Sequence, residues 1–118
     1  MTILIVEDEI DARETLRDAF EDAGYSVGVA ANGLEALAIL QSETPKVVLL
    51  DLVMPMMTGN EVYEAMRREA RWSSIPVVIT TSDPSRAPDG TFVMRKPLDL
   101  RKLLLVVEQI ANAPPAKP

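Results

Sequence analysis

The sequence predicts one α/β domain built on a doubly wound parallel sheet. Short apolar runs alternate with longer amphipathic segments along the chain, and four of these runs are followed directly by polar residues. Apolar runs of this length fit strands buried on both faces, which are typical of parallel sheets. Strands that alternate with amphipathic helices form right-handed crossovers and place helices on both faces of the sheet.

We expect five strands, at residues 3–6, 25–29, 47–50, 76–79 and 92–94. The run 47–50 stops at Asp51, and Pro55 shortly afterwards cannot continue a strand, so the chain must turn there. Asp51 is therefore expected at the carboxyl end of a buried strand. In open parallel sheets, ligands bind at that edge.

Apolar residues at three- and four-residue spacing predict a helix after each of the first three strands and a closing helix after the fifth. Gly24 suits the position that ends the first helix, and Asp99 is a candidate N-cap for the last one. We expect a domain over residues 1–112 and a flexible Pro/Ala tail or linker stump over residues 113–118.

Composition excludes several kinds of site. The chain of 118 residues is long enough for one core. It has no cysteine and no histidine, which excludes disulfides, thiol catalysis, catalytic triads and metal sites that use those ligands. No apolar run approaches the roughly 18 residues that span a bilayer, and no basic leader precedes the first strand, so we expect a cytoplasmic protein without membrane contact.

Charge is unevenly distributed along the chain. The net charge of −6 argues against direct nucleic-acid binding. Residues 1–61 hold twelve acidic and three basic residues, whereas residues 62–118 hold six acidic and nine basic ones. This asymmetry is either ordinary solvated surface or a basic surface for a partner in the second half.

Polar side chains with distinct chemistry follow four of the predicted strands. They are Glu7 and Asp8 after the first, Asp51 after the third, Thr81 after the fourth and Lys96 after the fifth. Parallel strands bring these ends to one edge, where three carboxylates repel one another and require a cation. Carboxylate oxygens completed by water suit Mg²⁺.

These residues also form motifs with specific spacing. The motifs are the pair Glu7-Asp8, the segment Asp51-Leu-Val-Met-Pro-Met-Met-Thr-Gly59, the hydroxyl residue Thr81, and Lys96-Pro97. From Ile3 to Ile110 the sequence resembles the receiver domains of two-component response regulators. The resemblance implies a flavodoxin-like (CheY-like) sheet of five strands in the order 2-1-3-4-5, which is carried over from that family.

The resemblance also assigns roles. Asp51 would accept a phosphoryl group from a histidine kinase or phosphotransfer protein. Lys96 and the Thr81 hydroxyl would contact the phosphoryl oxygens, and Pro97 is a candidate cis proline. The implied Mg²⁺ ligands are the carboxylates of Glu7, Asp8 and Asp51 and the backbone oxygen of Val53. A domain of this kind is not an enzyme beyond its own phosphotransfer and autodephosphorylation.

Two features depart from the family pattern. The position three residues before Lys96, where an aromatic residue usually takes part in the switch, is Val93, and we expect the neighbouring Phe92 to be a core residue. Only ten residues separate Thr81 from Phe92, and two prolines interrupt them. We therefore predict that the fourth helix is missing or reduced to about one turn.

A reduced crossover would leave part of one sheet face uncovered. We expect self-association or a downstream protein partner on the 82–111 side, whose basic residues are Arg86, Arg95, Arg101 and Lys102. The alternative is that the loop folds over the gap.

Three classes of function fit the motifs. The first is a Mg²⁺-dependent phosphoacceptor that switches a protein-interaction surface. The second is a phosphorylation-independent interaction or dimerisation module of the same shape. The third, a Mg²⁺-dependent aspartyl-phosphate hydrolase, ranks lowest, because such enzymes carry an acid two residues after the nucleophile and Val53 occupies that position here.

Overall fold

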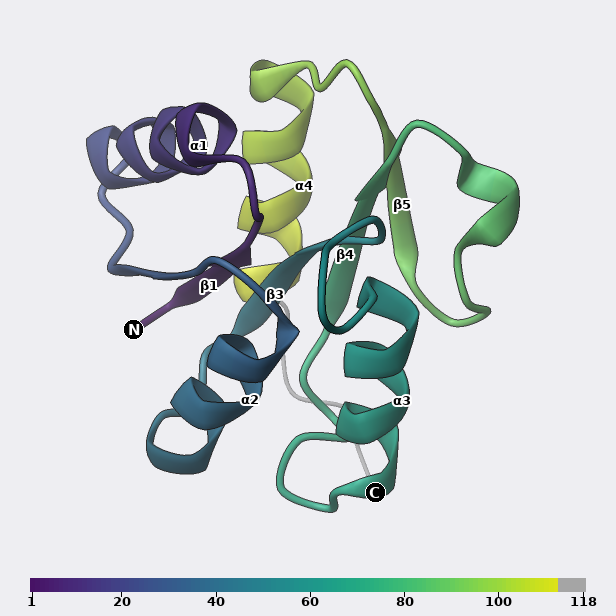
Figure 1. Ribbon diagram of the computed structural model, residues 1–118. Coiled ribbons are helices and arrows are strands. Elements are labelled where there is room, and N and C mark those ends of the chain that lie inside the picture. Colours follow the sequence, from purple (N-terminus) through teal and green to yellow (C-terminus); the bar gives the residue numbers. More distant parts are fainter. Residues whose placement is uncertain (113–118) are drawn as a thin grey trace.

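A computed structural model describes residues 1–112 and contains, within them, a five-stranded parallel sheet with four α-helices and one short 3-10 helix. In chain order the elements are β1 (Ile3–Val6), α1 (Ile10–Asp22), β2 (Val27–Ala30), α2 (Gly33–Ser42), β3 (Val47–Asp51), α3 (Gly59–Arg68), β4 (Val77–Thr81), η1 (Pro84–Arg86), β5 (Phe92–Arg95) and α4 (Leu100–Ala111). The strand order is β2-β1-β3-β4-β5 (Figure 1), which confirms the predicted class and order. The predicted tail at 113–118 lies outside the described residues.

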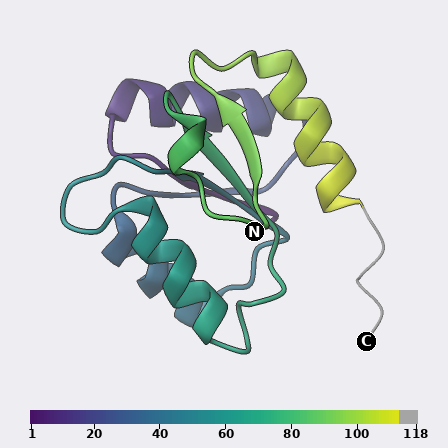
Figure 2. The ribbon, with the colours of Figure 1, turned by 90° about the vertical axis from the view of Figure 1, so that its right-hand side faces the viewer.

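The sheet separates two apolar cores. Helices α1 and α4 cover one face, and α2 and α3 cover the other (Figure 2). Every residue of β1 and β3 is buried, as expected for central strands with helices on both sides. None of the helices within residues 1–112 is long and apolar enough to span a bilayer.

Local signals in the sequence set several helix ends. Gly24 follows α1 with φ of 96°, a conformation that glycine adopts without strain, and the Asp99 side chain accepts hydrogen bonds from two backbone N–H groups in the first turn of α4. Both confirm the predicted caps. Thr58 and Glu61 form a reciprocal capping box at the start of α3, directly after the Asp51 loop.

The prediction that the fourth helix is missing or reduced to about one turn is wrong. Four α-helices lie within residues 1–112, and the fourth, α4, has 12 residues. Between β4 and β5 the chain forms the three-residue helix η1. The two prolines limit the chain only in this crossover, where Pro84 takes the first position of η1 and Pro88 follows its end. Helix α4, which closes the described chain, contains no proline.

The 82–91 loop adds Ala87 to the core on the α3 side but leaves β5 exposed. That core also contains Val77 and Ile79 of β4, which are both buried. In β5, by contrast, Phe92 is 53% exposed and Val93 is 39% exposed. The prediction that Phe92 is a core residue is therefore wrong, because β5 is an edge strand paired only with β4.

Candidate functional site

The carboxyl ends of β1, β3, β4 and β5 meet at one edge of the sheet, as the parallel topology requires. Register pairs Val6 with Leu50, and Asp51 with Thr80, so the residues after β1 and at the end of β3 come together. A recess of about 400 Å³ opens there. It is lined by Glu7, Asp8, Glu9, Asp51, Val53, Thr81, Ser82 and Lys96.

Three carboxylates gather in this recess. One oxygen from each of Glu7, Asp8 and Asp51 lies within 4.8 Å of the others. Glu7 and Asp51 are buried, whereas Asp8 is exposed to solvent. An all-oxygen set that is open to water on one side suits a hard divalent cation such as Mg²⁺.

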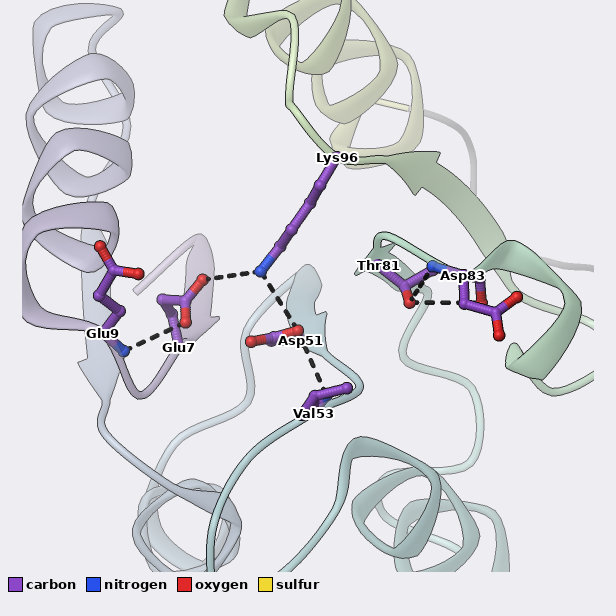
Figure 3. A network of polar contacts seen from close by, with 7 residues as sticks. All are labelled: Glu7, Glu9, Asp51, Val53, Thr81, Asp83 and Lys96. Atoms are coloured by element: carbon purple, nitrogen blue, oxygen red, sulfur yellow. Dashed lines mark hydrogen bonds and ion pairs between the residues drawn. The ribbon is translucent and has the colours of Figure 1, made fainter.

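Within residues 1–112, Lys96 is the only basic residue whose side chain lies within ion-pair distance of these carboxylates. Its Nζ atom lies 3.4 Å from Glu7 Oε1 and 3.4 Å from Asp51 Oδ1 (Figure 3). Partial burial by itself lowers the pKa of Lys96, but the charges of Asp51 and Glu7 outweigh it, so the pKa is raised. One ammonium against three carboxylates leaves the cluster negative, which favours a further cation.

The chain positions Lys96 through β5. Its backbone N–H donates to the Thr81 carbonyl oxygen at 2.8 Å, which continues the β4–β5 ladder to the rim of the site. The peptide bond between Lys96 and Pro97 is cis. Figure 3 shows the lysine side chain extending from the end of β5 to a point between Glu7 and Asp51.

The loop after β3 holds Asp51 in place. The Val53 N–H donates to Asp51 Oδ1 at 3.3 Å, and the Gly59 N–H donates to the Leu52 carbonyl oxygen at 2.9 Å. A Cβ added at Gly59 would overlap the Asp51 carbonyl oxygen and Leu52 Cα. Glycine is therefore required where α3 begins against the backbone that carries Asp51.

Thr81 lines the recess, but its hydroxyl is bonded to the following loop. The Asp83 N–H donates to Thr81 Oγ1 at 3.0 Å, and that hydroxyl donates to the Asp83 carbonyl oxygen at 3.3 Å. In Figure 3 this pair lies to one side of the Lys96 contacts. The Asp83 carboxylate in turn accepts from the Ser85 hydroxyl, which lowers the pKa of Asp83.

Sequence reasoning missed some of these contacts. The link from Thr81 to Asp83 was not anticipated, although Asp83 before Pro84 is a recognisable capping signal for a short helix. Glu9 and Ser82, which were not among the predicted site residues, also line the recess. Val93, singled out as the position without an aromatic residue, is not among the lining residues.

The arrangement matches a known family. The model of the response regulator receiver domain matches residues 3–108. The chain belongs to this family. Receiver domains are signalling modules rather than classical enzymes, and phosphorylation on an aspartate is their general property.

Individual relatives agree with this assignment. An uncharacterised 14.6 kDa protein of Leptolyngbya boryana is 35% identical over 98% of this chain and 93% of its own length. Response regulator Rre1 of Synechocystis is 37% identical over 70% of this chain, and the match covers 36% of Rre1. The solved structure of chemotaxis protein CheY4 from Vibrio cholerae is 32% identical with a TM-score of 0.85, covering 92% of this chain and 97% of CheY4.

Proposed function

We propose that this receiver domain accepts a phosphoryl group on Asp51 in a Mg²⁺-dependent reaction and thereby switches a protein-interaction surface. The observation that carries the proposal is the contact of Lys96 with both Glu7 and Asp51, inside a cluster whose three carboxylates lie within 4.8 Å of one another. A lysine with its pKa raised stays protonated at neutral pH and can pair with a phosphoryl oxygen.

In the proposed reaction, a carboxylate oxygen of Asp51 attacks the phosphorus of a phosphohistidine, and the bond from phosphorus to the histidine nitrogen breaks. Lys96 would offset charge on the transferred oxygens. The Val53 N–H, which already donates to Asp51, helps to orient the nucleophile. Because these groups are set by β3, β5 and their loops, the chemistry requires little movement.

Receiver domains bind Mg²⁺ in an acidic active site, and the cluster here has suitable donors. We propose that Glu7, Asp8, Asp51 and the carbonyl oxygen of Val53 hold the ion. When bound, Mg²⁺ offsets the charge on the phosphoryl oxygens during transfer. Asp8, as the exposed member, would be the carboxylate most accessible to an incoming hydrated ion.

The switch is proposed to begin at Thr81. Its hydroxyl bonds to Asp83 in this structure, and a phosphoryl oxygen on Asp51 would offer it a charged acceptor instead. Turning towards that acceptor would release Asp83 and the η1 loop. Phosphorylation would therefore shift the balance between two loop arrangements.

Receiver domains interact with histidine kinases, phosphotransfer proteins and effector domains. For this chain we propose a histidine kinase or phosphotransfer protein as the phosphoryl donor, in the cytoplasm. The output would be a downstream protein or a second copy, bound through the 82–111 side. A phosphorylation-independent module remains the alternative, since Val93 replaces the usual aromatic residue.

The test is the intact mass of the protein after incubation with acetyl phosphate and Mg²⁺. We expect the wild type and the Asp18→Asn control, which alters an exposed carboxylate on α1, to gain one phosphoryl group. Asp51→Asn and wild type treated with a chelator should gain none. A wild-type protein that stays unmodified would overturn the proposal, as would equal modification of Asp51→Asn.

A further inference from the structure

The 82–91 loop, which connects β4 to β5, is held in place mainly by polar contacts. Figure 1 shows this loop beyond the outer edge of β5. Residues 82–86 are all exposed, and Ala87 is the loop residue that packs against the apolar core. A segment that buries so little apolar surface gains little stability from packing. Its hydrogen bonds to the rest of the domain therefore decide where it lies.

Helix η1 connects Thr81 to helix α3. The Asp83 carbonyl oxygen accepts from the Thr81 hydroxyl at 3.3 Å and from the Arg86 N–H at 3.2 Å. The Arg86 carbonyl oxygen accepts in turn from the Asn60 side chain at 3.2 Å. Pro84, whose ring fixes φ, takes the first position of η1. One turn of helix thus links the hydroxyl at the site to the second residue of α3.

Tyr63 of α3 holds the other end of the loop. Its hydroxyl donates to the Asp89 carbonyl oxygen at 3.3 Å and accepts from Arg67 at 3.1 Å. Since a hydroxyl has one hydrogen, the bond from Arg67 leaves that hydrogen for Asp89. Gly90 follows with φ of 85°, and a Cβ there would lie 3.3 Å from the Tyr63 hydroxyl. Asn60 and Tyr63, which lie three residues apart on one face of α3, therefore hold both ends of the loop.

Space beside the loop allows a second arrangement. A groove of about 350 Å³ lies between the 82–91 loop and the segment that follows β3. Asp83 and Arg86 line it from the loop, and Val53 and Thr58 line it from that segment. Because residues 82–86 are exposed, a shift of this part of the loop would displace no buried side chain of its own.

We propose that Asn60 and Tyr63 are positioning residues, which hold the loop in the arrangement where Thr81 bonds to Asp83 and thereby restrain phosphorylation. This inference rests on the proposed function of Asp51. The Thr81 hydroxyl must leave the Asp83 carbonyl before it can donate to a phosphoryl oxygen. The Asp83 N–H and carbonyl then need new partners, and a loop held at both ends by α3 resists the shift that would supply them.

The coupling between α3 and the phosphoryl group must act in both directions. Removal of a hydrogen bond to α3 should favour the phosphorylated arrangement, and a phosphoryl group should weaken the bonds to α3. A single hydrogen bond of this kind changes an equilibrium by about two- to tenfold. This sets the size of the expected effect.

The affinity for beryllofluoride with Mg²⁺ tests the proposal, because this reversible mimic of a phosphoryl group can be followed by fluorine NMR. We expect Asn60→Ala and Tyr63→Phe each to bind it about two- to tenfold more tightly than wild type. Phenylalanine keeps the buried Tyr63 ring. Tyr25→Phe is the matched control, since that ring packs against the core on the opposite face of the sheet, and its affinity should equal that of wild type. Residues that only supported the site structurally would weaken binding when altered.

A double-mutant cycle tests the route through Thr81. Thr81→Val removes the hydroxyl and keeps the shape of the side chain. If the restraint acts through that hydroxyl, Tyr63→Phe should add nothing to the affinity of Thr81→Val. A gain as large as that seen in the wild-type background would overturn this route.

Trp72 reports the reverse direction of the coupling. It is the single tryptophan of the chain, and it lines a cavity of about 180 Å³ together with Tyr63 and Gly90. Saturation with beryllofluoride should change the emission of Trp72 in wild type and change it less in Tyr63→Phe, where the bond to Asp89 is already absent. Unchanged emission in wild type would contradict release of this end of the loop.

The outcomes separate this proposal from the phosphoacceptor proposal. Unchanged melting temperatures establish that the variants fold. If wild type binds beryllofluoride and both α3 variants bind it equally or more weakly, the restraint is overturned and the role of Asp51 stands. If folded wild type binds no beryllofluoride, both proposals are overturned.

Discussion

The central strands and the edge strand of this sheet differ in how completely the rest of the chain covers them. β1 and β3 are buried at every residue, and the residues at their ends form the acidic cluster. β5 has no fully buried residue, yet it delivers Lys96 to that cluster. The difference indicates that the acidic cluster lies at the end of the most completely buried strands, whereas the least covered strand lies at the edge of the sheet.

Shortening a buried side chain in β3 should lower the free energy of unfolding far more than shortening an exposed side chain in β5, and this is the largest difference that we expect between the two regions. Leu50→Ala in β3 removes a fully buried side chain and should lower the free energy of unfolding by about 2–5 kcal/mol. Phe92→Ala in β5 should cost less than about 1 kcal/mol, because half of the ring is already exposed. Urea denaturation of both variants measures this contrast. Equal losses would show that β5 is packed as tightly as the centre.

Gly59→Ala should disturb the site by displacing the backbone that carries Asp51. The added Cβ meets backbone atoms of Asp51 and Leu52, which cannot move aside as a flexible side chain can. We expect a loss of about 1–3 kcal/mol in unfolding free energy together with slower phosphorylation. Asn60→Ala, one position further along α3, is the control and should change stability by less than about 1 kcal/mol. Phosphorylation of Gly59→Ala at the wild-type rate would contradict the close fit.

Lys96 should link stability to pH at the alkaline end. Its pKa in the folded chain is raised above the ordinary 10.5, so its contribution is complete below that pH and is lost as pH rises through the raised value. The difference in unfolding free energy between wild type and Lys96→Gln should be constant from pH 7 to 9 and shrink above about pH 10.5. Chemical denaturation across this range measures the difference, and growth of the difference above pH 10.5 would contradict the ion pairs.

Met56 gives the smallest expected effect. It has φ of 72° and is 74% exposed, so a strained backbone holds an apolar side chain on the loop between β3 and α3. Met56→Gly should raise stability by roughly 0.5–1 kcal/mol by removing that strain. Met56→Ala keeps the strain and should show no gain. Thermal melts compare the stabilities of the two variants. Equal stability would show that the positive φ at residue 56 does not strain the backbone.

Much of the central region could be predicted from the sequence, because each buried strand is a continuous apolar run that stops at a polar residue. That pattern led to Asp51, Glu7, Asp8, Thr81 and Lys96 at one edge. The edge strand was harder. Phe92 looks like a core residue by type, and only the three-dimensional fold shows that nothing in residues 1–112 fully covers it. The bond between Thr81 and Asp83 depends on a loop conformation that side-chain spacing does not determine.

The central claim is that the buried phosphoacceptor site works independently of the exposed edge strand. The most direct test is to measure the intact mass of three proteins after incubation with acetyl phosphate and Mg²⁺. We predict that wild type and Val93→Lys gain one phosphoryl group at the same rate, whereas Asp8→Asn, which removes a proposed metal ligand, gains it far more slowly. Equal modification of Asp8→Asn and wild type, or loss of modification in Val93→Lys, would contradict the separation.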